Sequence, residues 1–187
     1  MKQKWFFIFT GIFLIFSGCL TFESMETHIV HPQSNQPGKI IVTVTNIGTT
    51  ENEPERINAD FKELLNELEG DQFLLDAVSD GIYIKSRRVY LDNNILKASY
   101  EGIFGSLENL ENCSIRDNQI FMKMDADSQS IAETNGTIQE IGEETYIVWP
   151  LDAEDLYWKV VNENWDPDKN PSLAPLWKKY VGQKDER

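Results

Sequence analysis

Short apolar runs separated by turn signals fill most of the chain after Gly70, and they limit what the chain can fold into. Many of these runs alternate apolar with polar residues or are rich in β-branched side chains, as half-buried strands are. Consecutive strands joined by tight turns pair antiparallel, so we expect a mostly antiparallel sheet. The runs span residues 72–78, 81–91, 95–104, 114–116, 119–124, 137–141, 144–149 and 156–161.

Two short polar segments are the strongest hairpin signals. Asp92-Asn93-Asn94 and Asn135-Gly136 contain residues that accept a positive φ at little cost. Earlier in the chain, residues 26–30 and 39–46 are two further strand-like runs, separated by a proline- and glycine-containing segment. We expect these two runs to form a hairpin with a long loop.

Residues 53–69 form the clearest predicted helix. Pro54 lies in its first turn, and Gly70 follows at a position that ends helices. Its apolar residues fall at helical spacing and form one stripe: Ile57, Phe61, Leu64, Leu65 and Leu68. Such a stripe must be buried, so we expect an α+β domain in which one main helix packs on the sheet in two layers.

The N-terminus has the anatomy of an export signal. Lys2 and Lys4 precede an apolar stretch over residues 5–16, and the small residues Ser17 and Gly18 follow. We therefore expect a signal peptide over 1–18, a tether over 19–25, the α+β domain over 26–161 and a C-terminal loop and short helix over 162–187. An uncleaved membrane helix over 5–22 and free secretion are the alternatives.

The segment Phe16-Ser17-Gly18-Cys19 resembles the lipobox of bacterial lipoproteins, with Phe16 where that pattern prefers Leu. The resemblance implies that Cys19 is the lipid attachment site, acylated with palmitate-like chains, and becomes the new N-terminus. The implied location is the extracytoplasmic side of the cell membrane or outer membrane. Leu20 follows Cys19, where an Asp would imply retention in the inner membrane of a two-membrane bacterium.

The charge of the chain disfavours nucleic acid as a partner. It carries 31 acidic and 17 basic residues, a formal net charge of -14. Phosphate backbones and anionic lipid head groups are recognised by clustered Lys and Arg, and they repel a strongly negative body.

Catalytic and metal-binding patterns are weak in this sequence. His28 and His31 are the only histidines, and surface histidines near a strand end account for them better than a metal site. No Ser-His-Asp or Cys-His arrangement stands out, and the sequence has no phosphate-binding glycine motif. We expect a protein without enzymatic activity, metal or cofactor.

Aromatic residues are dense in the last forty residues or so and are the most unusual surface candidate. The candidate binding residues are Trp149, Trp158, Trp165, Trp177 and Tyr180. Core packing is the competing interpretation, because alternation along a strand points some of them inward. Ser172 is placed to cap a short helix whose apolar face docks either on its own domain or on another protein.

Several features together resemble the LppM-like class of bacterial lipoproteins. They are the lipobox, the run KIIVTVTN at 39–46, the helix at 53–69, Thr134-Asn-Gly136 and residues 146–151. The resemblance implies an α+β fold without a settled enzymatic activity. We expect a membrane-anchored binding or envelope-interaction domain with an envelope protein as partner. The alternative is a carrier of a small apolar or lipid ligand held between helix and sheet.

Overall fold

The computed structural model describes residues 19–32, 36–124 and 129–185, so the predicted signal peptide at 1–18 lies outside the described residues. The helices are α1 (Pro54–Glu69), α2 (Gln72–Ser79) and α3 (Ala174–Asp185), with a short 3-10 turn, η1, at Leu107–Asn109. The strands are β1 (Leu20–Val30), β2 (Gly38–Thr49), β3 (Ile82–Asp92), β4 (Ile95–Phe104), β5 (Cys113–Arg116), β6 (Gln119–Met124), β7 (Gln129–Thr134), β8 (Thr137–Ile141), β9 (Glu144–Pro150) and β10 (Asp155–Asn162).

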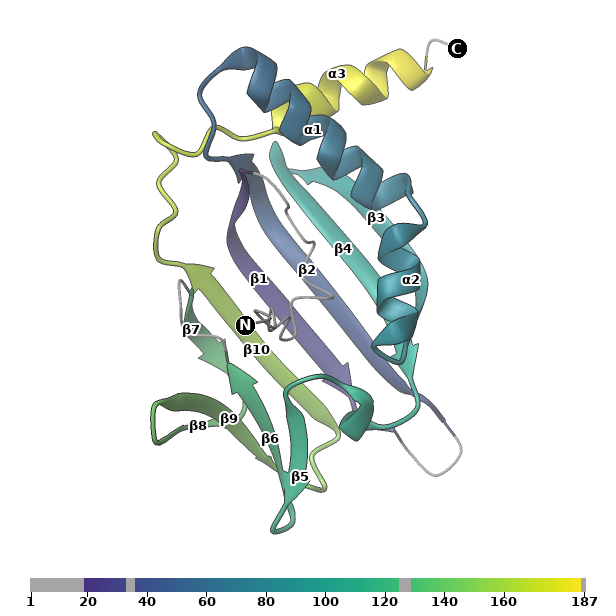
Figure 1. The fold of residues 1–187 in the computed structure, drawn as a ribbon, viewed down its shortest axis with the longest axis vertical. Helices are drawn as coiled ribbons and strands as arrows, with labels where there is room; N and C mark the ends of the chain where they lie inside the picture. Colours follow the sequence, from purple (N-terminus) through teal and green to yellow (C-terminus); the bar gives the residue numbers. More distant parts are fainter. Residues whose placement is uncertain (1–18, 33–35, 125–128, 186–187) are drawn as a thin grey trace, which may run out of the picture.

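The strands form two sheets in which every described pairing is antiparallel (Figure 1). The large sheet has the order β3-β4-β2-β1-β10-β7, and the small sheet has the order β5-β6-β9-β8. The expectation of a mostly antiparallel fold with helices is therefore confirmed. The finer expectation, one main helix packed on one sheet in two layers, is not confirmed, because the described residues form two sheets and three α-helices.

One face of the large sheet is covered in two ways. Helices α1 and α2 lie over β3, β4 and β2, whereas the small sheet lies over the β10 side (Figure 1). Phe73 of α2 packs edge-on against Tyr100 of β4 with 5.6 Å between ring centroids. Trp149 of β9 packs against Trp158 of β10 with centroids 6.0 Å apart. Both contacts belong to one hydrophobic core, and each fully buried apolar side chain there stabilises the fold by about 1.5–3 kcal/mol.

Helix α1 confirms the prediction made from its spacing. Phe61 and Leu64 are its buried apolar residues. The helix ends at Gly70, whose N–H donates to the Asn66 carbonyl at 2.7 Å. A Cβ at position 70 would lie 2.4 Å from that same carbonyl oxygen, so the close approach requires glycine.

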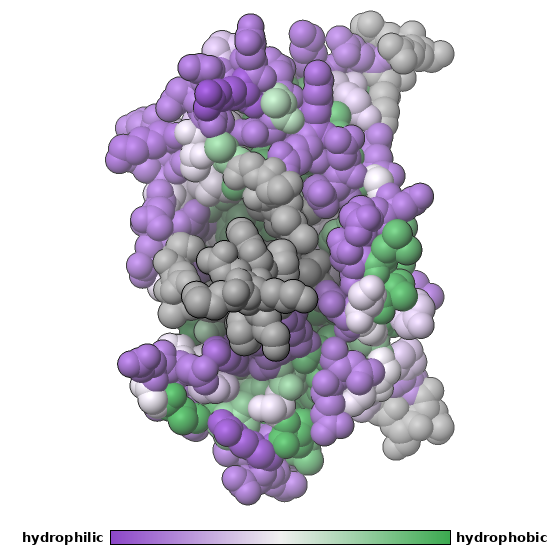
Figure 2. All heavy atoms as spheres, in the orientation of Figure 1, coloured by the Kyte–Doolittle hydropathy of each residue, from purple (hydrophilic) through white to green (hydrophobic). Residues whose placement is uncertain are grey.

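The prediction of a strand at residues 72–78 is wrong, because these residues form α2. Phe73 and Ala77, four positions apart, are the buried residues of α2 and face the sheet. A short apolar run has no clear period, and the partner surface decides between strand and helix. Leu75 and Val78 are 60% and 47% exposed. Figure 2 shows apolar residues over α2 on an otherwise mostly hydrophilic face.

The predicted tether at 19–25 is also wrong, because strand β1 begins at Leu20. Leu20 and Phe22 are each 7% exposed, and β1 pairs with β2 on one side and β10 on the other. The segment is too short to show a period of its own, and pairing on both edges makes it a strand. The predicted hairpin of 26–30 with 39–46 is confirmed as β1–β2, which extends further in both directions.

Of the two predicted hairpin turns, one is confirmed and one is wrong. Asn93 and Asn94, with φ of 50° and 68°, connect β3 to β4 as expected. Asn135 and Gly136 instead carry the chain between sheets, since β7 pairs with β10 and β8 pairs with β9. Residues 129–134, which form β7, were not among the predicted strands, so the sequence offered no strand of the large sheet before this turn.

On one edge of β2, the backbone hydrogen-bonding partner changes at Asn46, whose φ is 59°. Before it, β2 pairs with β4 as far as Thr45. Beyond it, the Thr49 N–H donates to the Pro171 carbonyl at 3.2 Å, and the Leu173 N–H donates to the Ile47 carbonyl at 3.1 Å. The C-terminal segment is therefore attached to the end of β2, on the edge opposite to β1.

Candidate functional site

Cys19, the predicted lipid attachment residue, lies directly at the edge of the folded body. Its carbonyl accepts the Thr50 N–H at 2.7 Å, and the next residue, Leu20, pairs with Thr49. The Cys19 side chain is half-buried, and its Sγ donates to Glu51 Oε1 at 2.9 Å. The residue that would carry the lipid is thus held in place by backbone and side chain alike.

A hydrogen bond to Glu51 disfavours the thiolate form of Cys19. The hydrogen bond to the Glu51 carboxylate is the main cause that raises the pKa of the Cys19 thiol. The same hydrogen bond is the main cause that lowers the pKa of Glu51. Arg56 Nη1 lies 3.3 Å from Glu51 Oε1 and adds to that lowering. A free Cys19 is therefore a weak nucleophile at neutral pH.

A buried polar contact lies beside Cys19. The Thr49 hydroxyl, which is 0% exposed, donates to the carboxylate of Asp60 on α1, which is 7% exposed. The same hydroxyl accepts the Glu51 N–H at 3.0 Å. This contact ties β2 to α1, and we call Cys19, Thr49, Glu51 and Asp60, together with α3, the anchor end.

Helix α3 is docked on its own domain. Leu173 and Ala174 are buried, and the Ser172 hydroxyl accepts the Ala174 N–H at 3.2 Å as the predicted cap. The Tyr180 ring packs edge-on against Phe61 at 6.1 Å between centroids. These contacts favour the first of the two docking alternatives, the one within the chain.

Three of the five candidate aromatic residues lie at this end and remain partly exposed. A Cβ at Gly48 would lie 2.9 Å from Cη2 of Trp165, so the indole covers the end of β2. Trp177 and Tyr180 of α3 lie with ring centroids 5.7 Å apart, and the Tyr180 hydroxyl donates to Glu69 Oε1 at 2.8 Å. Each ring has one side on the protein.

The other two candidates, Trp149 and Trp158, are core residues, so their prediction as surface residues is wrong. They are 2% and 3% exposed, and they contact each other where the two sheets meet. Trp158 alternates with less buried neighbours along β10, whereas Trp149 follows two other buried residues on β9, and the two lie in the core from opposite sheets. Aromatic density in a sequence does not tell an inward from an outward position.

Asn135 joins the two sheets through its side-chain amide, instead of forming the predicted hairpin turn. Its Oδ1 accepts the Trp149 Nε1–H at 2.7 Å and the Tyr157 N–H at 2.9 Å, and its Nδ2 donates to the Asp155 carbonyl at 3.0 Å. A Cβ on the next residue, Gly136, would lie 2.6 Å from Cε2 of Trp149. We call Asn135, Gly136, Trp149 and Trp158 the inter-sheet joint. The Asn-Gly pair predicted a turn correctly, but the turn connects strands of two different sheets and does not form a hairpin.

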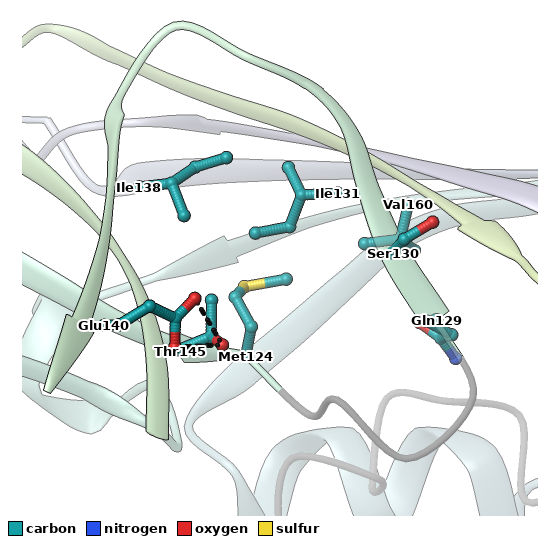
Figure 3. A pocket seen from close by; sticks show the side chains of 8 residues that line it. All are labelled: Met124, Gln129, Ser130, Ile131, Ile138, Glu140, Thr145 and Val160. Carbon is teal, nitrogen blue, oxygen red and sulfur yellow. Dashed lines mark hydrogen bonds between the residues drawn. The ribbon is translucent and has the colours of Figure 1, made fainter. Parts of the chain in front are cut away.

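A cleft of about 220 Å³ lies between the sheets near β7 and β8 (Figure 3). Ile138 of β8 points toward Ile131 of β7 across it, and Met124 lies below them (Figure 3). Thr145 donates to the Glu140 carboxylate at 3.0 Å on its polar side. Residues of five strands line the cleft: Met124, Gln129, Ser130, Ile131, Ile138, Glu140, Thr145 and Val160.

The remaining chemical candidates are isolated. The His28 ring lies 4.5 Å from that of Tyr157, and its Nδ1 is 3.9 Å from the Asp155 carboxylate. Burial is the main cause that raises the pKa of the Cys113 thiol to about 12. Among the described residues, no group of three or more His, Cys, Asp and Glu side chains is arranged to hold a metal ion.

No family model matches the chain, no curated protein matches it, and no solved structure matches it. In the described part of the chain, no helix has the length and apolar character needed to cross a membrane.

Proposed function

We propose that this protein is an extracytoplasmic lipoprotein whose folded domain is held directly at a membrane surface by lipid on Cys19. The observation that carries the proposal is the position of Cys19. An apolar stretch and the small residues Ser17 and Gly18 precede it, and strand β1 begins at the next residue. An acylated Cys19 leaves no flexible segment between lipid and fold.

The surroundings of Cys19 are compatible with acylation. A thioether at Sγ has no proton, so the hydrogen bond to Glu51 is lost when lipid is attached. Glu51 keeps Arg56, whose Nη1 is 3.3 Å away, and the carboxylate is not left without a counter-charge. Two or more acyl chains on one cysteine then give stable retention, whereas one chain binds only marginally.

The role that fits this arrangement is binding or contact within the envelope, without catalysis. The thiols of Cys19 and Cys113 both have a raised pKa and are poor nucleophiles. His28 is exposed, lies in a tilted ring contact with Tyr157 and is not among the residues that line the cleft. The partly exposed aromatic residues and α3 lie at the same end of the domain as Cys19, which supports a contact surface beside the membrane.

Fractionation of cells that express the full chain tests the anchor. With Cys19→Ala we expect the protein to leave the membrane fraction, while the matched Cys113→Ala protein stays in it. If the Cys19→Ala protein stays in the membrane, the N-terminus of the unsubstituted protein decides. A start at Met1 there would contradict the proposal and would favour an uncleaved helix over residues 5–22.

A second candidate function, a carrier of a small apolar group, is favoured by the inter-sheet cleft. Its volume of about 220 Å³ exceeds the roughly 150 Å³ of an engineered apolar cavity that binds benzene. Beneath α1 the core is filled, since Leu64 is 0% exposed, so the ligand would lie between the sheets.

Titration with decanoate, followed by calorimetry, tests this second candidate. Ile131→Trp fills the cleft and should abolish binding, whereas Ile141→Trp, at an exposed position of β8, should leave it unchanged. Absence of heat with the unmodified protein would exclude a carrier of such chains.

A further inference from the structure

Helix α3 differs in charge from the rest of this acidic protein. Residues 174–185 contain three lysines and one aspartate, in a chain whose formal net charge is -14. Lys178 and Lys179 are both exposed. In contrast, α1 contains two basic and five acidic residues. Of these two helices, α3 therefore carries a net positive charge and α1 a net negative one.

Of the α3 lysines, Lys178 and Lys179 lack the carboxylate partners that most other described lysines have. Lys39, Lys97 and Lys159 lie 3.1, 2.8 and 3.1 Å from carboxylates on neighbouring strands or turns. Within the described ranges, Lys178 and Lys179 have no carboxylate at ion-pair distance. Lys178 donates to the Asn94 amide oxygen at 2.8 Å, which leaves its charge uncompensated.

The start of α3 is close to Cys19 and fixed relative to it. Ser172 forms a bridge with Gly48, which pairs with Thr21, two residues after Cys19. Two strand spacings separate them, about 10 Å. The helix then extends about 18 Å over the same end of the sheet, since each residue adds about 1.5 Å. Tyr180 holds it against α1 through Glu69 and Phe61.

We propose that α3 is a lipid-headgroup contact that binds anionic phospholipid of the membrane in which Cys19 is anchored. This inference rests on the proposed function and names the partner of the anchor end. Lipid on Cys19 brings that end to the surface, and Lys178 and Lys179 meet the anionic headgroups. Trp177, half-buried beside them, is of a type enriched at membrane interfaces.

The remaining charges strengthen the orientation. Near Cys19, the carboxylates of Glu51 and Glu53 both contact Arg56, each at 3.3 Å, and Asp166 lies 2.9 Å from Lys169. The acidic body elsewhere is repelled by an anionic surface, so a rotation that removes α3 from the membrane costs free energy. The anchor fixes one point of the domain, and α3 fixes its tilt.

The electrostatic contribution can be stated as a fold-change. Each lysine close to an anionic bilayer contributes about 1 kcal/mol, and every 1.4 kcal/mol is tenfold. Neutralising both lysines should therefore lower the ratio of membrane-apposed to free α3 by roughly 30-fold. High salt should reduce the same ratio, because exposed charges are screened.

Hydrogen exchange of the membrane-extracted full-length product tests the inference. The protein is reconstituted into vesicles of phosphatidylcholine alone or of phosphatidylcholine with phosphatidylglycerol. We expect the amides of 174–185 to be protected in the anionic vesicles and not in the neutral ones. K178Q/K179Q should remove this difference. K62Q/K85Q should keep it, because it removes the same charge from exposed positions on α1 and β3.

The outcomes separate the inference from the proposed function. Equal exchange of α3 in both kinds of vesicle, or equal effects of the two double variants, would overturn the inference. Intact mass of the same sample reports the lipid on Cys19 independently. A chain that keeps residues 5–22 and carries no lipid on Cys19 would contradict the proposed function. The hydrogen exchange of α3 would still test the inference separately. An unchanged melting temperature of K178Q/K179Q excludes unfolding as the cause.

Discussion

The inter-sheet joint and the anchor end both combine tryptophan with a polar side chain, but they differ in how far these side chains are buried from solvent. At the joint, Trp149 and Trp158 are 2% and 3% exposed, and the Asn135 amide binds the Trp149 indole. At the anchor end, Trp165 and Trp177 are half-buried, and Cys19 is accessible from solvent. The same residue type thus serves core stability in one region and surface contact in the other.

Truncation of one tryptophan in each region should test this difference with the largest effect. Trp149→Ala removes a fully buried indole and leaves a cavity, so we expect a loss of about 3–5 kcal/mol in the free energy of unfolding. Trp177→Ala removes a half-exposed one and should cost about 1 kcal/mol. Urea unfolding measures both. Equal losses would show that the two regions are not distinct.

The next largest effect should come from the buried polar contact of the anchor end. Thr49→Val keeps the shape but leaves the buried Asp60 carboxylate without its hydroxyl donor, at a cost of about 1.5–3 kcal/mol. Thr43→Val is the matched control, since its hydroxyl donates at 3.3 Å to Ser99 on a half-buried surface. If Thr49→Val unfolds at the same urea concentration as the unsubstituted protein, the role assigned to this contact is contradicted.

A single added methyl group should test the closure of the joint. In Gly136→Ala the new Cβ would lie 2.6 Å from both Cε2 of Trp149 and Cγ2 of Ile147, so we expect about 1–3 kcal/mol of destabilisation. Gly105→Ala places a Cβ with nothing within 4 Å and should be close to neutral. Thermal unfolding compares the two, and a neutral Gly136→Ala would mean that the joint has room to adjust.

The two cysteines give the smallest and most local comparison. In the chain made by cell-free synthesis, which leaves Cys19 unacylated, iodoacetamide should modify Cys19 before Cys113, because the pKa of Cys113 is raised to about 12. Glu51→Gln removes the main cause that raises the pKa of Cys19. More thiolate is then present at a given pH, and the pH profile of Cys19 alkylation should shift to lower pH. A shift to higher pH would contradict this role of Glu51.

Long periodic segments were predictable from sequence, and short ones were not. The stripe of α1 and the alternation of β4 each span ten or more residues, so their period is visible without a partner. Residues 20–25 and 72–78 are shorter. Pairing on both edges makes the first a strand, and packing of Phe73 against Tyr100 fixes the second as a helix. These are tertiary effects that no local pattern contains.

The candidate site was predictable in part. Cys19 could be named from the residues before it, and the structure adds its contacts with Thr50 and Glu51. The aromatic residues could be named but not sorted, because inward or outward orientation depends on which sheet faces the strand. The cleft could not be found, since Ile131 and Ile138 belong to different sheets.

The central claim is that lipid on Cys19 holds the fold directly at the membrane. Intact mass of the mature protein extracted from membranes tests it most directly. We predict a chain that begins at Cys19 and carries the additional mass of at least two acyl chains. A chain that begins at Met1, or one that begins at Cys19 without acyl mass, would contradict the account.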